Sequence, residues 1–351
     1  MFSDLKYSIL LPILIAFVIS AILGPIVIPW LHRLKFGQYI REDGPKAHQK
    51  KSGTPTMGGI IFLLAAMVAS LFFVKDFPKI IPVMFTTLGF GIIGFLDDYI
   101  KVVKKRNLGL TEIQKIILQL IVTAIFGFYL IRYSGVGTKM LVPFTGGFEN
   151  GIYLDLPMWL YIPGLLIIML GTVNGTNLTD GLDGLATGVS VPIVAVLGVL
   201  AYLSGHIVYA DYLNIMYIPG SGEMVVFAAA LVGALVGFLW YNSFPAQIFM
   251  GDTGSLAIGG VIAVFALCIR KELLLPLLCG VFLVESFSVM MQVGWFKYTK
   301  RRYGEGRRIL LMSPVHHHYQ KKGIFETKIV LRFWIISLLL AAITLVTLKI
   351  R

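Results

Sequence analysis

The chain has 351 residues, of which 57% are hydrophobic and only 14% are charged, whereas about a quarter of the residues in an ordinary soluble domain are charged. The mean hydropathy of +0.83 agrees with this composition, so a soluble globular protein is excluded. The two cysteines, Cys268 and Cys279, both lie inside apolar runs. That setting is typical of small buried apolar side chains, and it excludes a disulfide framework and a cysteine metal site.

Hydrophobic runs of ~20 residues recur along the whole chain, and each is long enough to cross a bilayer as a helix. The first run contains three prolines but has no small-residue cleavage site, so it is predicted to stay as a span and not to be removed as a signal peptide. We expect an all-α, polytopic integral membrane protein with residues 1–351 as a single transmembrane domain. About ten transmembrane helices are predicted, over residues 9–31, 54–74, 79–96, 116–133, 157–176, 186–204, 224–241, 255–270, 272–294 and 329–348.

Basic residues gather in alternate connections. The net charge is +12, and the loops after spans one, three and nine hold 20 of the 30 lysines and arginines. With ten spans these three loops open on one side of the membrane, which the positive-inside rule places in the cytoplasm. Both termini are then expected outside.

Five aspartates lie on this same predicted side, close to the ends of spans. They belong to the segments FLDDY, NLTDGLDGL and MGDTG, and they are Asp97, Asp98, Asp180, Asp183 and Asp252. A single aspartate beside the membrane is commonly a solvated interface residue. Five in three segments of matching sidedness favour a functional site, because carboxylates at membrane depth are costly.

This pattern is typical of a site for a divalent metal together with phosphates. Mg²⁺ binds one or two carboxylates and completes its shell with phosphate oxygens and water, while lysines and arginines neutralise the remaining phosphate charge. The glycines of DGLDG and MGDTG let the backbone approach a bulky ligand. The sequence therefore predicts Mg²⁺ as a cofactor.

A histidine triplet follows the most basic stretch of the chain, at His316, His317 and His318. Consecutive residues of a regular element cannot all point at one ion, and no cysteine lies near, so zinc is disfavoured. Hydrogen bonding of the imidazoles to phosphate or pyrophosphate is the favoured interpretation.

The chain resembles the phospho-N-acetylmuramoyl-pentapeptide transferases, within the polyprenyl-phosphate N-acetylhexosamine-1-phosphate transferase superfamily. The likeness extends over essentially the whole chain. The DD, NxxDGxDGL and GDTGS elements are shared across the superfamily, while GTPTMGG and SPVHHHYQKKG are specific to the muramoyl-pentapeptide branch. The segments that carry it are GPKAHQKKSGTPTMGG (44–59), FLDDYIKVVKKRNLGL (95–110), NLTDGLDGLATG (177–188), FPAQIFMGDTGSLAIGG (244–260) and MSPVHHHYQKKGIFETKIVLRFW (312–334).

The resemblance implies a Mg²⁺-dependent phosphoglycosyl transferase of the bacterial inner membrane, with its active site facing the cytoplasm. Phospho-MurNAc-pentapeptide would move from UDP-MurNAc-pentapeptide to undecaprenyl phosphate, giving lipid I and UMP in the first membrane step of peptidoglycan synthesis. The implied partners are these two substrates and membrane lipid, with no nucleic acid; a homodimer is left open.

The resemblance also implies roles for individual residues. Asp252 would be the Mg²⁺ ligand. Of the adjacent Asp97 and Asp98, whose side chains must diverge on a helix, one would position the metal or the lipid phosphate and the other would act as a base. A one-step attack by the lipid phosphate is favoured over a two-step route with Asp252 as nucleophile, because a carboxylate that holds a metal is a poor nucleophile.

Other residues match the family's substrate site. Lys51 and Lys115 would neutralise phosphate charge, Lys115 as part of the catalytic set, with Thr56 beside Lys51. Phe249 would stack on uracil. The remaining substrate-binding candidates are Asn177, Asp180 and Asp183 on the nucleoside side, Asn242 and Gln292 as weaker members, and His316, His317 and His318 at the pyrophosphate or sugar.

Three other interpretations stay open at this point. A sister transferase of GlcNAc-1-phosphate would share DD, NxxDGxDGL and GDTGS but differ around the histidine triplet. A secondary transporter would place its acidic residues near the midplane, in symmetric halves with broken helices. A non-catalytic lipid-binding scaffold would give no reason for an aspartate of the metal-binding type in GDTGS.

Overall fold

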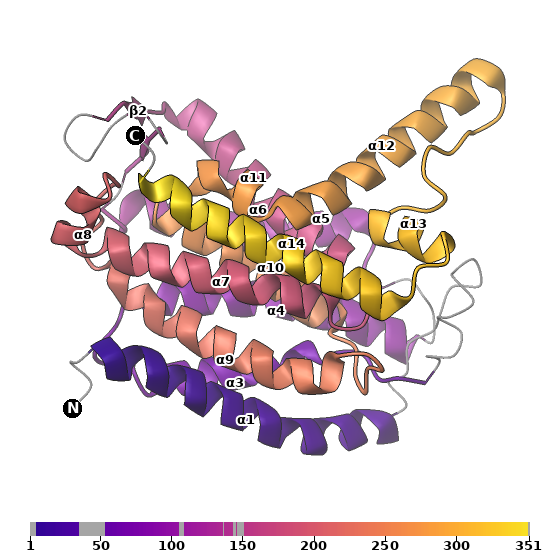
Figure 1. Ribbon diagram of the computed structural model, residues 1–351, viewed down its shortest axis with the longest axis horizontal. Helices are drawn as coiled ribbons and strands as arrows, with labels where there is room; N and C mark the ends of the chain where they lie inside the picture. The colour runs from indigo at the N-terminus through magenta and orange to yellow at the C-terminus, as the bar shows by residue number, and fades with distance from the viewer. Residues whose placement is uncertain are drawn as a thin grey trace.

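The structure is a computed structural model that describes residues 5–34, 53–104, 109–135, 137–142, 145 and 151–349 (Figure 1). The predicted all-α class is confirmed, since the only strands in the described part of the chain are two of three residues each. The helices are α1 (Leu5–Arg33), α3 (Gly59–Leu71), α4 (Ile80–Val103), α5 (Glu112–Arg132), α6 (Met158–Thr179), α7 (Leu185–Ser204), α8 (Ile207–Tyr212), α9 (Met224–Asn242), α10 (Gly251–Cys268), α11 (Leu275–Leu278), α12 (Gly280–Tyr303), α13 (Val315–Lys321) and α14 (Glu326–Val346), with short 3-10 turns at Ser221–Glu223, Glu272–Leu274 and Thr347–Lys349.

Eight of the described helices are long and apolar enough to cross a membrane, and the bent pair α11 and α12 makes a ninth if it counts as one span. The segment predicted as a span over residues 54–74 contains a shorter apolar helix than expected. Only the 13 residues Gly59–Leu71 are helical there, which gives a helix of ~20 Å against the ~30 Å of a bilayer core. The residues before Gly59 do not continue the helix, and their backbone is hydrogen-bonded to another segment: Phe249 donates its backbone N–H to Pro55, and Gly58 donates to Phe249.

The segment predicted as a span over 272–294 is bent in the structure. The chain bends by 80° between Glu272–Leu278 and Gly280–Tyr303, so that α12 leaves the bundle and its far end projects away from it (Figure 1). The chain after α12 returns along this helix. Thr299 accepts the backbone N–H of Arg307 at 2.9 Å, and Gln292 accepts those of Ile309 and Leu310 at 3.1 and 2.9 Å.

The long helices lie side by side and run back and forth between the two ends of the bundle (Figure 1). One end carries α13 and the connections that follow α4, α6 and α9. The other carries α8 and an antiparallel hairpin of β1 (Lys139–Leu141) and β2 (Tyr153–Asp155), in which Met140 pairs with Leu154. The beginning of α1 and the end of α14 both lie at this second end.

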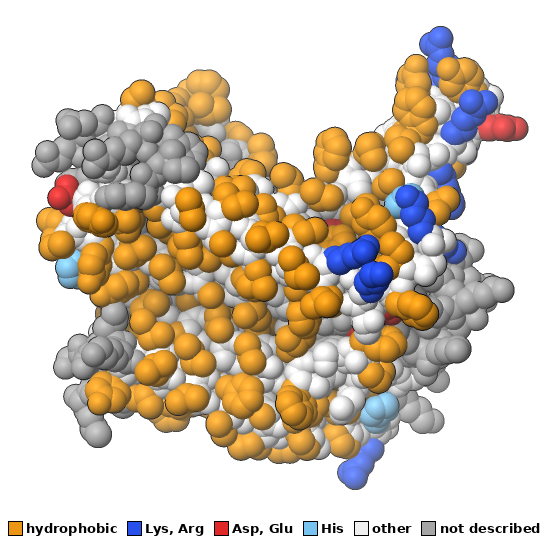
Figure 2. Space-filling model, in the orientation of Figure 1, with side chains coloured by type: hydrophobic (Ala, Val, Ile, Leu, Met, Phe, Trp, Pro, Cys, Tyr) orange, Lys and Arg blue, Asp and Glu red, His pale blue; other side chains and the backbone are white. Residues whose placement is uncertain are grey.

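Helix α10 forms the centre of the bundle. Most of its side chains are buried, and it contacts α4, α6, α3 and α7. Large apolar side chains instead cover the outer surface, where Figure 2 shows a hydrophobic face over α1, α7, α9 and α14 with cationic groups gathered toward the α12 and α13 end. Apolar side chains on the outer surface as well as in the core are typical of a protein that is surrounded by lipid. The single-domain assignment stays a prediction.

Candidate active site

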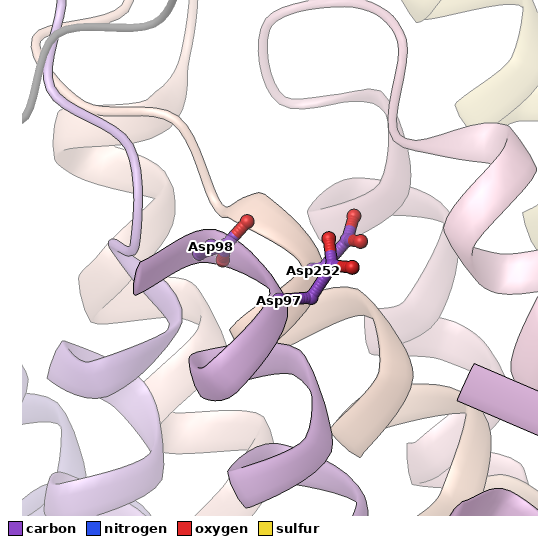
Figure 3. Close-up of side chains that lie close together, drawn as sticks. All are labelled: Asp97, Asp98 and Asp252. Atoms are coloured by element: carbon purple, nitrogen blue, oxygen red, sulfur yellow. The ribbon is translucent and has the colours of Figure 1, made fainter. Parts of the chain in front are cut away.

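Asp97 and Asp98 lie within α4 and not at its end, because the helix continues to Val103 beyond the predicted end at residue 96. Their exposed fractions are 1% and 2%. As predicted, the two side chains diverge (Figure 3). Asp97 accepts the backbone N–H of Leu110 at 2.8 Å, and Asp98 accepts both the N–H and the hydroxyl of Thr253, at 2.9 and 2.8 Å.

Asp252 lies in the first turn of α10, which begins at Gly251, four residues before the predicted start of that span. Gly251 before it has a φ of +73°, and a Cβ there would lie within 3 Å of side-chain oxygens of Asp98 and Thr56. A Cβ at Gly94 on α4 would overlap the carbonyl oxygen of Asp252. Two glycines therefore allow α4 and the start of α10 to approach until their carboxylates meet.

Two lysines bind these carboxylates. The Nζ of Lys101 on α4 is 2.6 Å from Asp97, 3.6 Å from Asp98 and 3.1 Å from Asp252. The Nζ of Lys115, in the first turn of α5, is 2.6 Å from Asp252 and 3.4 Å from Asp97. The five groups carry a formal net charge of −1, which leaves room for one divalent cation beside bound phosphates.

Lys101 was not among the sequence candidates, although it follows Asp97 and Asp98 by four and three residues. On a helix these spacings place side chains on one face. The predicted end of the span at residue 96 hid this relationship, because it assigned Lys101 to a loop.

Asn177 binds the other oxygen of Asp252. It lies near the end of α6, and its Nδ2 donates to Oδ1 of Asp252 at 2.8 Å and to the hydroxyl of Ser255 at 2.9 Å. One carboxylate oxygen of Asp252 thus accepts a hydrogen bond from Asn177, and the other is bound by the two lysines. Each partner comes from a different helix, so the orientation of this carboxylate depends on the packing of α4, α5, α6 and α10.

Asp97, Asp98 and Asp252 fit the chemistry of a site for a hard cation. Each can offer one oxygen, and these three oxygens lie within 4.8 Å of one another (Figure 3). No histidine or cysteine belongs to this cluster, the only group with metal-site spacing found in the described residues. An all-oxygen set suits Mg²⁺ or Ca²⁺ and not zinc.

Asp180 and Asp183 lie in the turn between α6 and α7 and differ in their surroundings. Burial raises the pKa of Asp180 to about 8, and the negative charges of Asp252 and Asp98 add to this effect. Asp183 accepts the backbone N–H of Ala246 at 3.0 Å, and its own N–H is bound by Glu326. Asp183 therefore connects this turn to the segment before α10.

Thr56 and Phe249 come together through the non-helical residues before α3. Thr56 is buried close to Gly251 and Asp98. Phe249 is half-buried, and its backbone carries the two hydrogen bonds to Pro55 and Gly58. Lys51, predicted to lie beside Thr56, is outside the described residues.

Asn242 and Gln292 form hydrogen bonds with other groups of the protein itself. Asn242 accepts the hydroxyl of Thr187 at 2.7 Å and donates to the carbonyl of Ile248 at 3.0 Å. Gln292 holds the chain that returns along α12. The roles of both in substrate binding stay predictions.

The three histidines have different hydrogen-bond and ion-pair partners, although the ring centroids of His316 and His317 are 4.2 Å apart. His316 is fully buried, 3.1 Å from Glu285 of α12, and its ring lies against Gly181. Nδ1 of His317 is 2.8 Å from the side-chain oxygen of Gln320, and Nδ1 of His318 accepts the N–H of Leu311 at 3.1 Å. His316 links α13 to the Asp180 turn through its contact with Gly181.

Comparison with known proteins identifies the family. The family model described as "Glycosyl transferase family 4" matches residues 80–270. The model described as "Phospho-N-acetylmuramoyl-pentapeptide-transferase signature 1" matches residues 51–63. A protein named phospho-N-acetylmuramoyl-pentapeptide-transferase from Flavobacterium psychrophilum is 46% identical over 100% of this chain and 95% of its own length. One of the same name from Chlorobium phaeobacteroides is 49% identical over 95% of this chain and 90% of its own length.

The matches define a membrane-embedded glycosyl transferase of family 4. Within that class, the chain belongs to the phospho-N-acetylmuramoyl-pentapeptide transferases. The resemblance drawn from the sequence is confirmed, and the signature over residues 51–63 favours this branch over a GlcNAc-1-phosphate transferase.

Proposed function

We propose that the chain transfers phospho-MurNAc-pentapeptide from UDP-MurNAc-pentapeptide to undecaprenyl phosphate, with release of UMP. The observation that carries this proposal is the cluster of three aspartates and two lysines at one end of a bundle of apolar helices. A water-soluble nucleotide sugar and a lipid phosphate can meet only where the spans end. A transporter would need its charged site near the midplane instead.

We propose Mg²⁺ as the cofactor, held by Asp252 with Asp97 or Asp98. When bound, the ion would neutralise phosphate charge and polarise a phosphoryl oxygen. The carboxylate oxygens within 4.8 Å of one another support this assignment. Lys101 and Lys115 lie beside the same oxygens, and they would bind the non-bridging oxygens of the two phosphates.

The reaction we favour has one step. An oxygen of the lipid phosphate attacks the β-phosphorus of the nucleotide sugar, and the bond from that phosphorus to the oxygen bridging it to UMP breaks. The bridging oxygen leaves with UMP, and the new P–O–P linkage joins lipid and sugar. A phosphate monoester is largely ionised near pH 7, so positioning and charge neutralisation are the main needs.

The nucleotide would lie on the side of the site formed by Phe249, Asn177, Asp180 and Asp183, with the phosphates toward Asp252. Phe249 adjoins the Asp252 helix and the signature segment, and its half-exposed ring can stack on a base. His317 and His318, at the open side of α13, would bind the pyrophosphate or the sugar. The site would face the cytoplasm of a bacterial inner membrane, as the cation distribution predicts.

UMP release by detergent-solubilised protein tests the reaction and its mechanism together. The protein is stripped of metal with EDTA and supplied with UDP-MurNAc-pentapeptide, with or without undecaprenyl phosphate. We expect UMP only when both the lipid and added Mg²⁺ are present. A burst of one UMP per protein without lipid would show a covalent intermediate, and full turnover in EDTA would remove the metal from the proposal.

A further inference from the structure

A pair of hydrogen-bonded amides, one buried and one half-buried, lies directly beneath the candidate site. Gln119 on α5 and Asn174 on α6 exchange two hydrogen bonds: Asn174 Nδ2 donates to Gln119 Oε1 at 2.9 Å, and Gln119 Nε2 donates to Asn174 Oδ1 at 3.4 Å. The same Nδ2 also donates to the carbonyl of Leu170, one turn earlier on α6, at 2.8 Å. Gln119 is completely buried. Both residues lie inside helices long and apolar enough to span the membrane.

The positions of these amides connect them to Asp252. Gln119 follows Lys115 by four residues on α5, and Asn174 precedes Asn177 by three residues on α6, so each amide lies one turn below a residue that binds Asp252. Lys115 reaches Oδ2 of that carboxylate at 2.6 Å, and Asn177 reaches Oδ1 at 2.8 Å. The two helices thus hold opposite oxygens of one carboxylate.

Membrane helices associate through close packing of small residues and through hydrogen bonds between polar side chains such as these amides. An amide pair differs from such packing because its hydrogen bonds form at one axial register only. A slide of either helix by a fraction of a turn would separate the groups and leave polar atoms unpaired in an apolar environment.

We infer that Gln119 and Asn174 are positioning residues, which fix the register of α5 against α6 so that Lys115 and Asn177 hold the Asp252 carboxylate in one orientation. This inference rests on the proposed role of Asp252. It assigns no contact with substrate to either amide.

Steady-state kinetics on matched variants tests the inference. Gln119→Leu and Asn174→Leu each remove the pair at similar volume. Each should lower kcat at least tenfold, which is about 1.4 kcal/mol of barrier, with both KM values within threefold of the wild type. The control is Thr123→Val, one turn deeper on the same face of α5. Thr123 is buried, and its hydroxyl has no hydrogen-bond partner among the described residues, so this variant should stay within twofold.

A rescue separates positioning from general packing. The double variant Gln119→Asn with Asn174→Gln moves one methylene across the interface and restores both amides. It should recover kcat to within threefold of the wild type, whereas Gln119→Asn alone should not. This comparison also decides the matter if the leucine variants fail to fold, which their thermal unfolding in detergent would show. No recovery in the double variant would overturn the inference.

The background variant Lys115→Arg distinguishes this inference from the proposed site itself. In that background Gln119→Leu should cost less than a further threefold in kcat, because the group it positions has already been displaced. If Lys115→Arg and Asn177→Ala keep full activity, the proposed site is wrong. If those two lose activity but Gln119→Leu keeps more than a third of kcat, the site stands and the positioning role is wrong.

Discussion

The Nζ atom of Lys115 lies 2.6 Å from Oδ2 of Asp252, although 137 residues separate the two in the chain. One belongs to the first turn of α5 and the other to the first turn of α10, helices that both begin at the same end of the bundle (Figure 1). Their contact joins a cation and a carboxylate where little water is available to screen them. It is the shortest of the ion pairs that Asp252 forms in the described structure.

Asp252→Asn should reduce turnover at least a hundredfold, about 2.7 kcal/mol of barrier. The amide keeps the volume but loses the charge that would hold Mg²⁺ and bind both lysines. UMP release is the measurement, and thermal unfolding in detergent checks that the variant folds. The matched control is Asp211→Asn, an exposed aspartate on α8 at the opposite end, which should not change activity. Retention of activity within tenfold at Asp252 would contradict the assignment.

Lys101→Met should lower kcat at least thirtyfold, because this side chain contacts all three aspartates of the cluster. The natural control is Lys104→Met, since Lys104 is exposed at the end of the same helix and should tolerate the change. Kinetics at saturating substrate distinguish the two. Equal activity of both variants would show that Lys101 serves only to neutralise the empty carboxylates.

Phe249→Ala should raise the KM for UDP-MurNAc-pentapeptide tenfold to a hundredfold, from the loss of ~1–3 kcal/mol of base stacking. The KM for undecaprenyl phosphate should hardly change. Phe244→Ala, in the same segment, is the control for loss of an exposed aromatic ring. Lower stability in detergent with unchanged substrate constants would instead assign Phe249 to packing.

Single cysteines in a background without Cys268 and Cys279 test the orientation in the membrane. Replacements at Lys104 and Arg301, exposed at the site end, should resist an impermeant thiol reagent in whole cells. A replacement at Asp211 should be labelled. The reverse labelling pattern would show the opposite orientation in the membrane and would contradict the predicted cytoplasmic site.

The pairing of His318 with Leu311 should weaken in acid. Burial and the positive charge of Lys322 lower the pKa of His318 below 6.5, and its Nδ1 must be unprotonated to accept the Leu311 N–H. A lowered pKa means that the unfolded chain binds the proton more readily, so the stabilisation is present above pH 6.5 and is lost as the pH falls below it. Hydrogen exchange of peptides spanning Leu311, corrected for intrinsic rates, should accelerate from pH 7.5 to pH 5.5. His318→Ala should remove this pH dependence; unchanged protection in the wild type would refute the pairing.

Helix positions followed from hydropathy where a span is straight and uninterrupted. The predicted 186–204 and 224–241 differ from α7 and α9 by a single residue at an end. Prediction failed where local hydropathy competes with a distant partner. Residues 54–58 were included in a predicted span, yet the backbones of Pro55 and Gly58 are hydrogen-bonded to Phe249, and no pattern within one segment reveals that pairing.

Site residues divide in the same manner. Asp97, Asp98 and Asp252 were predicted from motifs and matching sidedness, and the structure brings them together. Gln292 and His316 were predicted to bind substrate, and the structure adds their contacts with Leu310 and Glu285; their roles in substrate binding stay predictions. Residue type identified these side chains as able to hydrogen-bond a substrate, but the direction in which each side chain points depends on the path of the chain after α12.

The sequence by itself determined the lipid environment, the helical class, the end of the bundle that carries the charge, and the family. Each depends on composition, periodicity or a local motif, all of which are properties of neighbouring residues. Only the tertiary structure decided that Lys101, Lys115 and Asn177 share Asp252, and that α12 leaves the bundle. These features depend on the rotation and axial register of helices that are far apart in the chain. Close contacts such as that of Gly94 with Asp252 fix this register, and hydropathy does not encode it.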